Sequence, residues 1–234
     1  MEFVHAACVT NHRPHSPAPM FVGHIAVALA AKRAAPRTNL GLLALATQWA
    51  DTLWPVLVLL GVEQFEIRPG VTVMTPLDFI SYPWSHSLVM LVVWGALAYV
   101  AYRRGGGQRG ALVLGACVVS HWVLDWLTHR PDMPLAPFVD LKLGLGLWNH
   151  PAVEVALEGA LYAGGAWLYF TGTRARDGVG RWAVPALLVT LGGIWLASTF
   201  GPPPPSVEAV AYSALGGWLF FAWAWWGDAH REPA

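Results

Sequence analysis

Long apolar runs separated by short polar loops constrain this chain more than any other feature of its sequence. A helix needs about 20 apolar residues to cross a bilayer, because each residue rises about 1.5 Å against a hydrocarbon core of about 30 Å. The apolar runs are residues 21–31, 40–62, 87–102, 110–128, 152–171, 182–200 and 207–227. They predict an all-α fold, a polytopic transmembrane helical bundle of about seven helices, of which the first is short.

The composition agrees with lipid as the main solvent. Charged residues make up 12% of the chain, against about 25% in an ordinary soluble domain. Tryptophan collects at membrane interfaces, where its ring is apolar and its N–H is wet, and the chain has 14 tryptophans. A formal net charge of zero gives no sign of a nucleic-acid partner. We therefore expect the lipid bilayer as partner, together with a lipid or small-molecule substrate.

The beginning of the chain is polar, unlike the apolar runs after it. Residues 1–19 contain prolines and scattered histidines, and Met20 opens the first apolar run. We interpret residues 1–19 as a disordered extension or as the product of a start codon assigned too early. Residues 20–230 form one predicted transmembrane helical domain.

Positive charge in the loops predicts the orientation. Lys and Arg are more frequent in the cytoplasmic loops of membrane proteins. Here every second loop is basic, with Lys32, Arg33 and Arg37, then Arg103, Arg104 and Arg109, then Arg174, Arg176 and Arg181, and finally Arg231. Seven crossings with the N-terminus outside and the C-terminus in the cytoplasm satisfy this alternation.

Ionisable groups inside membrane helices are costly and usually functional. His121, Asp125 and His129 recur at intervals of four in the run 110–128 and just after it. Four residues advance a helix by about 400°, so the three side chains share one slowly drifting stripe. This spacing is typical of metal ligands.

The next predicted helix repeats the pattern, beginning at His150 and continuing with Glu154 and Glu158. Two facing helices that each carry such a stripe predict a shared metal site, as in di-metal carboxylate bundles. A structural alternative is that the two glutamates pair with Lys142 or Arg130.

Three further polar residues, His24, Asp51 and His86, fall toward the same non-basic side of the predicted bundle. The predicted topology depends on Lys and Arg alone, so this convergence supports the metal site independently. The structural alternatives are an interfacial role for a single histidine such as His24, and a polar network that holds Asp51 through Gln48 and Thr47.

The chemistry of these side chains favours a divalent metal, zinc first, with manganese or iron as alternatives. Cys8 and Cys117 stand far apart, so a thiolate site is not indicated. A surplus of oxygen ligands leaves positions for water and substrate, and a remaining carboxylate, Asp125 or Glu154, is then the predicted catalytic base. The predicted metal ligands are His24, Asp51, His86, His121, Asp125, His129 and His150.

Four short motifs in the same order resemble the YdjM-like family of inner-membrane proteins, which are described as predicted metal-dependent hydrolases. They cover roughly residues 24–129 and read Gly23-His24, Ala-Thr-Gln-Trp-Ala-Asp51, Ser85-His86-Ser87-Leu88 and Ser120-His121-Trp-Val-Leu-Asp125. The resemblance implies a bacterial inner-membrane location and a metal site formed by the histidines and aspartates of these motifs, His24, Asp51, His86, His121 and Asp125.

The chain departs from the family pattern at two places. Where the family commonly shows a P-D-x-D-H segment, this chain has Trp49-Ala50-Asp51-Thr52-Leu53, so one acid and one histidine are missing. The H-R-G-x-x-H-S pattern is reduced to Trp84-Ser85-His86-Ser87. His129, His150 and Glu154 are the candidates to replace the missing ligands.

These observations predict a membrane-embedded metal-dependent hydrolase that acts on an ester or phosphoester at the outer membrane interface. The competing hypothesis is a transporter of protons, metal ions or small solutes that uses buried His and Asp residues. A membrane di-iron oxidase is a third interpretation, although the chain has no H-x-x-x-H or H-x-x-H-H box.

Overall fold

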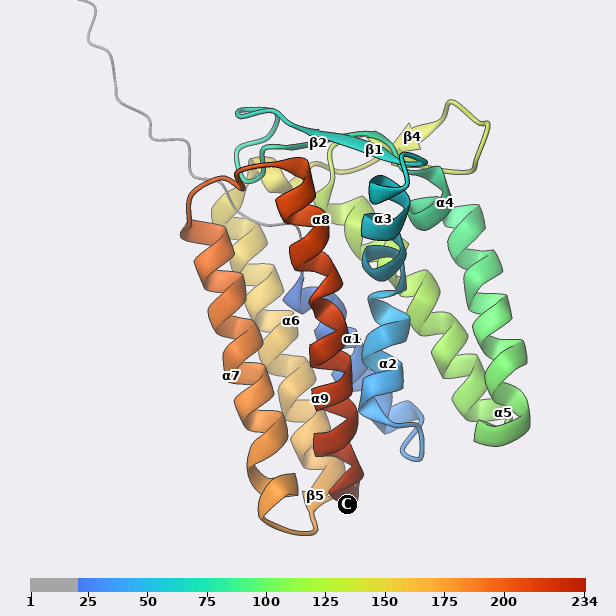
Figure 1. The fold of residues 1–234 in the computed structure, drawn as a ribbon. Helices are drawn as coiled ribbons and strands as arrows, with labels where there is room; N and C mark the ends of the chain where they lie inside the picture. Colours follow the sequence, from blue (N-terminus) through green and yellow to red (C-terminus); the bar gives the residue numbers. More distant parts are fainter. Residues whose placement is uncertain (1–20) are drawn as a thin grey trace, which may run out of the picture.

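A computed structural model describes residues 21–234 as a bundle of α-helices (Figure 1). The predicted all-α fold is confirmed, whereas the interpretation of residues 1–19 lies outside the described residues. The helices are α1 (Val22–Ala34), α2 (Leu40–Thr47), α3 (Trp49–Leu59), α4 (Pro83–His86), α5 (Leu88–Thr128), α6 (Pro151–Gly172), α7 (Gly178–Phe200), α8 (Val207–Leu215) and α9 (Gly217–Ala229). Each of the seven predicted apolar runs is helical.

Two breaks in these helices shape the bundle. The run 40–62 bends by 56° between α2 and α3, at Gln48. The runs 87–102 and 110–128 are the two halves of α5, which reverses direction where Gly107 adopts a φ of 75°. Glycine tolerates this conformation because it has no Cβ. The predicted loop between the two runs is therefore a sharp turn within α5.

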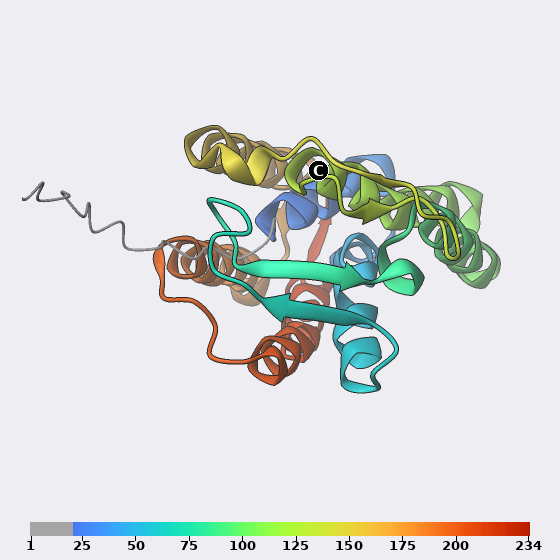
Figure 2. The same cartoon turned by 90° about the horizontal axis from the view of Figure 1, so that it is seen from above.

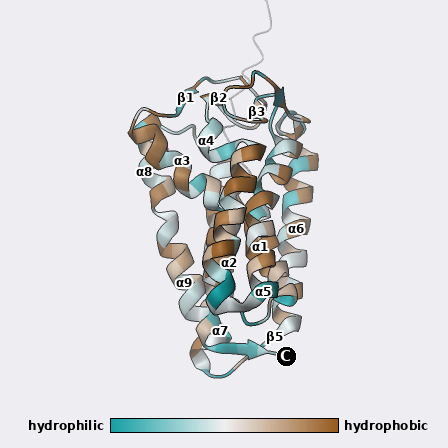
Figure 3. Ribbon diagram, turned by 90° about the vertical axis from the view of Figure 1, so that its right-hand side faces the viewer, coloured by the Kyte–Doolittle hydropathy of each residue, from teal (hydrophilic) through white to brown (hydrophobic). Residues whose placement is uncertain are grey.

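By length and composition, three helical stretches of the described chain are able to cross a membrane: α5 (Leu88–Thr128), α7 (Gly178–Phe200) and the consecutive pair α8 and α9 (Val207–Ala229). The bent pair α2 and α3 is a fourth if it forms a single span. Apolar residues make up much of the helical body, and polar residues are frequent at its two ends (Figure 3). This distribution agrees with an integral membrane protein.

Short antiparallel strand pairs close the two ends of the bundle. At one end, β1 (Gln64–Ile67) pairs with β2 (Leu77–Ser81), and β3 (Met133–Pro134) pairs with β4 (Lys142–Leu143). The β1–β2 hairpin lies across the helix ends when the bundle is seen from above (Figure 2). We call this the capped end. It also includes the 3-10 turn Leu147–Asn149 ahead of α6.

The opposite end contains the α1–α2 turn, the reversal of α5, and the pair β5 (Thr173–Ala175) and β6 (Arg231–Pro233) (Figure 1). The loops that the sequence marks as basic are all in this group, and we call it the basic end. The structure therefore gathers the basic loops at one end of the bundle, as the alternation of charge predicts.

Helix α1 packs against α5 on one side and α6 on the other. Its approach to α6 is close, because a Cβ added to Gly165 would lie 2.6 Å from the carbonyl oxygen of Ala26. Only a residue without a side chain fits at this contact. Gly165 therefore helps to set the position of α1.

We expect Gly165→Ala to lower the free energy of unfolding by about 1–3 kcal/mol, because the added methyl group overpacks the contact with the backbone of α1. Thermal unfolding of the purified protein in detergent measures the effect. Gly164→Ala is the matched control, since a Cβ at Gly164 meets no atom of residues 21–234 within 4 Å. Equal unfolding temperatures for the two variants would contradict the proposed close packing.

Candidate metal centre

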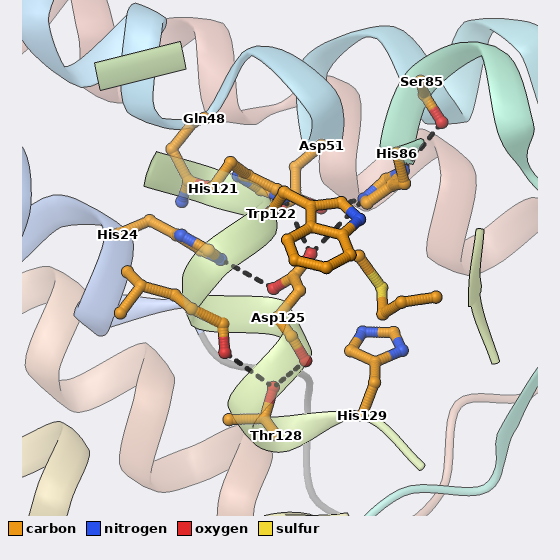
Figure 4. A network of polar contacts seen from close by, with 12 residues as sticks. His24, Gln48, Asp51, Ser85, His86, His121, Trp122, Asp125, Thr128 and His129 are labelled. Carbon is orange, nitrogen blue, oxygen red and sulfur yellow. Dashed lines mark hydrogen bonds and ion pairs between the residues drawn. The ribbon is translucent and has the colours of Figure 1, made fainter. Parts of the chain in front are cut away.

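Five side chains from four helices meet in the interior of the bundle. They are His24 of α1, Asp51 of α3, His86 of α4, and His121 and Asp125 of α5. Figure 4 shows the imidazoles turned toward the carboxylates. Four of these residues are between 0 and 4% exposed, whereas 35% of the Asp51 side chain is exposed. We call these five residues the His/Asp cluster.

The distances within the His/Asp cluster suit ligands of a cation. Asp125 lies between two histidines, with Oδ1 3.1 Å from His24 Nε2 and Oδ2 3.0 Å from His121 Nε2. Asp51 Oδ1 lies 3.4 Å from His86 Nε2 and 3.8 Å from His121 Nε2. Two atoms bound tetrahedrally to one zinc ion at about 2.0–2.2 Å lie about 3.3–3.6 Å apart. The observed separations bracket this value.

The His/Asp cluster divides into two overlapping groups of three. One contains His24, His121 and Asp125, and the other contains Asp51, His86 and His121. In each group the ligand atoms lie within 4.8 Å of one another. Because His121 belongs to both groups, the arrangement has room for one cation or for two neighbouring ones.

The break between α2 and α3 determines how His121 is presented. Thr47 is the last residue of α2, so its carbonyl has no amide partner within that helix. His121 Nδ1 lies 2.8 Å from this oxygen. A carbonyl oxygen accepts only, so Nδ1 carries the proton and donates it. In the neutral ring the lone pair is then on Nε2, the atom that faces the carboxylates.

This arrangement leaves a buried atom without a hydrogen-bond partner in the part of the chain that the structure describes. Among the described residues, His121 Nε2 has no hydrogen bond, although it lies 3.0 Å from Asp125 Oδ2. Two lone pairs at this distance repel each other unless a proton or a metal cation lies between them. The ion pairs of Asp51 and Asp125 in the described chain are with histidines alone. The residues therefore fit a divalent cation, which would neutralise both carboxylates.

The rings of His24 and His121 stack, with centroids 3.9 Å apart and planes inclined by 6°. Two imidazolium rings in this position would repel each other. Neutral rings that share a nearby cation avoid this cost. The stack therefore disfavours protonation of both rings at once, and a neutral ring is the form that binds metals.

His129, one of the predicted ligands, lies outside the His/Asp cluster (Figure 4). Helix α5 ends at Thr128, and His129 has an extended conformation, so the helical stripe stops before it. Its Nδ1 lies 2.9 Å from Asp132 Oδ1, and its ring packs on Trp148. Burial raises the pKa of Asp132, but hydrogen bonds with His129 and Arg130 outweigh this and leave the pKa below its usual value. His129 thus belongs to a polar network of the capped end.

His150 and Glu154 are not brought into the His/Asp cluster either. His150 is exposed at the start of α6. Glu154 is buried beside Glu158 on a face of α6 that meets α1. The expected pair of facing stripes does not form, because α1 contacts both α5 and α6.

Glu158 has a position that the sequence did not suggest. Its Oε1 accepts hydrogen bonds from the amides of Phe21 and Gly23, at 2.7 and 3.0 Å. A carboxylate at the N-terminus of a helix satisfies free amides and complements the helix dipole. Glu158 therefore anchors the start of α1, from which His24 projects toward Asp125. The sequence does show a charged residue within an apolar helix. It does not show the partner of Glu158, because Phe21 is 137 residues away in the chain.

A family model described as YdjM inner membrane protein matches residues 20–200 of the chain. This range is more than half of the chain and contains the whole His/Asp cluster. No curated protein and no solved structure matches the chain. The resemblance noted in the short motifs is confirmed.

Proposed function

The chain belongs to the YdjM inner membrane protein family, and we propose that it is a metal-dependent hydrolase embedded in the membrane. Its substrate is an ester or phosphoester, a lipid or a smaller molecule, that reaches the site from the outer membrane interface. We place the capped end outside, because the basic loops gather at the opposite end of the bundle.

The observation that carries this proposal is His121 Nε2, which has no hydrogen-bond partner among the described residues and lies 3.0 Å from a buried carboxylate oxygen. His24, His86, His121 and Asp125 would hold the metal, for which zinc is our first choice, and Asp51 lies beside them. Such an ion supplies a Lewis acid and makes water nucleophilic near neutral pH. The protein residues supply the orientation of these ligands and a largely dry site.

Asp51 is the best-placed proton acceptor for an attacking water molecule. Both oxygens of Asp125 lie close to histidines, and only 6% of its side chain is exposed. By contrast, 35% of the Asp51 side chain is exposed even though the residue lies next to His86 and His121. Water therefore reaches Asp51 more easily than Asp125, and Asp51 replaces Asp125 and Glu154 as our candidate base.

A cavity at the capped end supports substrate entry from this side. Its volume is about 270 Å³, and Tyr82, Phe138 and Lys142 are among the residues that line it. The ring of Tyr82 lies 5.1 Å from that of His86, so one lining residue of the cavity contacts the His/Asp cluster. Phe138 is 95% exposed on this rim, as expected of a side chain that contacts lipid or substrate at an interface.

A transporter is the second candidate function, and a buried ion pair between Lys32 and Asp228 favours it, because ionisable groups are then buried near both ends. However, Leu29 of α1 and Leu43 of α2 are fully buried and lie along their helices between this pair and the His/Asp cluster. A path for ions or protons needs polar groups that continue from one side to the other. The apolar layer therefore supports hydrolysis over transport.

We expect the zinc-loaded protein in detergent to hydrolyse p-nitrophenyl esters or bis(p-nitrophenyl) phosphate, and Asp51→Asn to lower kcat by about 10²- to 10⁴-fold through loss of the base. Glu208→Gln, an exposed carboxylate at the start of α8, is the control and should retain activity. Absence of hydrolysis together with zinc or proton flux in proteoliposomes would instead support the transporter.

A further inference from the structure

A buried glutamate outside the His/Asp cluster contacts one of its histidines through a serine. Glu63 lies between α3 and β1 and is 1% exposed. Its Oε1 accepts hydrogen bonds from the amides of Trp84 and Ser85, at 2.8 and 2.9 Å. Its Oε2 accepts a hydrogen bond from Ser85 Oγ at 2.6 Å. All three groups donate to Glu63, so this carboxylate acts as an acceptor only.

The same serine hydroxyl also contacts His86, with Ser85 Oγ 2.7 Å from His86 Nδ1. A hydroxyl has a single proton, and Ser85 donates this proton to Glu63. Toward His86 the hydroxyl oxygen is therefore the acceptor, and Nδ1–H must be the donor. In the neutral ring, Nε2 then has the lone pair.

The free nitrogen points into the His/Asp cluster. His86 Nε2 lies 3.4 Å from Asp51 Oδ1 and 3.9 Å from Asp125 Oδ2. His121 is brought to the same tautomer by the carbonyl of Thr47. Two unrelated parts of the chain thus impose one protonation pattern, in which both Nε2 atoms are free to bind a cation.

We propose that Glu63, acting through Ser85, is a positioning residue that holds His86 in the Nδ1–H tautomer and presents Nε2 as a ligand atom. The role of His86 Nε2 as a ligand atom rests on the proposed metal site. The tautomer of His86 does not depend on that proposal. Neither residue touches the reacting atoms. Their role is to orient His86 and to exclude the tautomer that cannot bind a metal.

Glu63→Gln tests the direction of these hydrogen bonds with almost no change in shape. The new amide NH₂ would donate to Ser85 Oγ, so the hydroxyl would turn its proton toward His86 Nδ1 and Nε2 would become protonated. We expect ¹⁵N NMR of the metal-free protein to show this inversion for His86, assigned by comparison with His86→Gln. We also expect the zinc Kd to rise by about 10- to 100-fold.

Two further variants separate positioning from folding. Ser85→Ala retains the amide groups that bind Glu63 and removes only the hydroxyl, so the Nδ1–H fraction of His86 and the zinc affinity should both fall. This variant keeps the proposal testable if Glu63→Gln does not fold. Glu66→Gln is the matched control, because Glu66 is an exposed glutamate of the neighbouring strand β1, where it pairs with Arg68.

An unchanged His86 tautomer in Glu63→Gln, or in Ser85→Ala if the first variant does not fold, would overturn the proposal. The proposal would also be overturned if Glu66→Gln changed the His86 tautomer as much as Glu63→Gln does. If the tautomer inverts but the wild-type protein binds no zinc, the positioning role stands and the proposed metal-dependent hydrolase fails. The two inferences therefore fail in distinguishable ways.

Discussion

Asp125→Asn is expected to remove most of the divalent metal from the purified protein. Asp125 is 4% exposed and lies between His24 and His121, at 3.1 and 3.0 Å. The amide keeps the size of the side chain but removes the negative charge and one of the two acceptor oxygens. Loss of an outer partner of a ligand usually lowers metal affinity by about 10- to 100-fold. We expect loss of the ligand itself to have at least this effect.

Elemental analysis of wild type and variant, purified in parallel, measures the result, and zinc titration gives the change in Kd. Asp132→Asn is the matched control. Asp132 is also a buried aspartate beside a histidine, but it binds His129 and Arg130 outside the His/Asp cluster. Equal metal content in wild type and Asp125→Asn would mean that the His/Asp cluster is not a metal site.

Lys32→Met is expected to lower the free energy of unfolding by about 3–5 kcal/mol, because it leaves a buried carboxylate without its cation. Lys32 Nζ lies 2.5 Å from Asp228 Oδ2, and the two side chains are 8% and 2% exposed. The other oxygen of Asp228 accepts a hydrogen bond from the hydroxyl of Tyr169 at 2.7 Å, and the amide of Leu40 donates to Oδ2 at 3.0 Å. This network joins α1, α2, α6 and α9 near the basic end.

The double variant Lys32→Met/Asp228→Asn should recover most of the lost stability. It removes both charges of this ion pair, and the asparagine oxygen still accepts a hydrogen bond from Tyr169 or Leu40. Thermal or SDS-induced unfolding in detergent micelles compares these proteins with Arg37→Met, which removes an exposed cation from the same turn. If the single and double variants are equally unstable, packing rather than the buried charge accounts for the effect.

Much of the fold could be predicted because hydropathy and helical periodicity act between neighbours in the chain. The bilayer accepts long apolar helices whose backbone hydrogen bonds are satisfied internally. For this reason the short run 21–31 could be recognised as the helix α1, and the basic loop 103–109 as the reversal of α5. The spacing of His121 and Asp125 placed both on one face of a helix, where the structure brings them together.

The residues that the structure leaves outside the His/Asp cluster lie there for local and non-local reasons. His129 has the correct spacing, but the helix ends one residue before it and its backbone is extended. Glu154 has the correct spacing on α6, but α1 packs against that helix. The role of Glu63 could not be predicted from the sequence, since it depends on a serine 22 positions away.

The sequence alone determined that the chain forms apolar helices, that basic loops alternate, and that histidines and carboxylates are buried within the bundle. Only the tertiary structure decided which of them meet and which nitrogen of the His86 and His121 rings is free. The physical reason is the distance along the chain over which each interaction acts. Burial in lipid and helical spacing depend on residues close in the chain, whereas ligand geometry depends on contacts between distant helices, such as that of Gly165 with Ala26, and on a broken helix that exposes the carbonyl of Thr47 to His121.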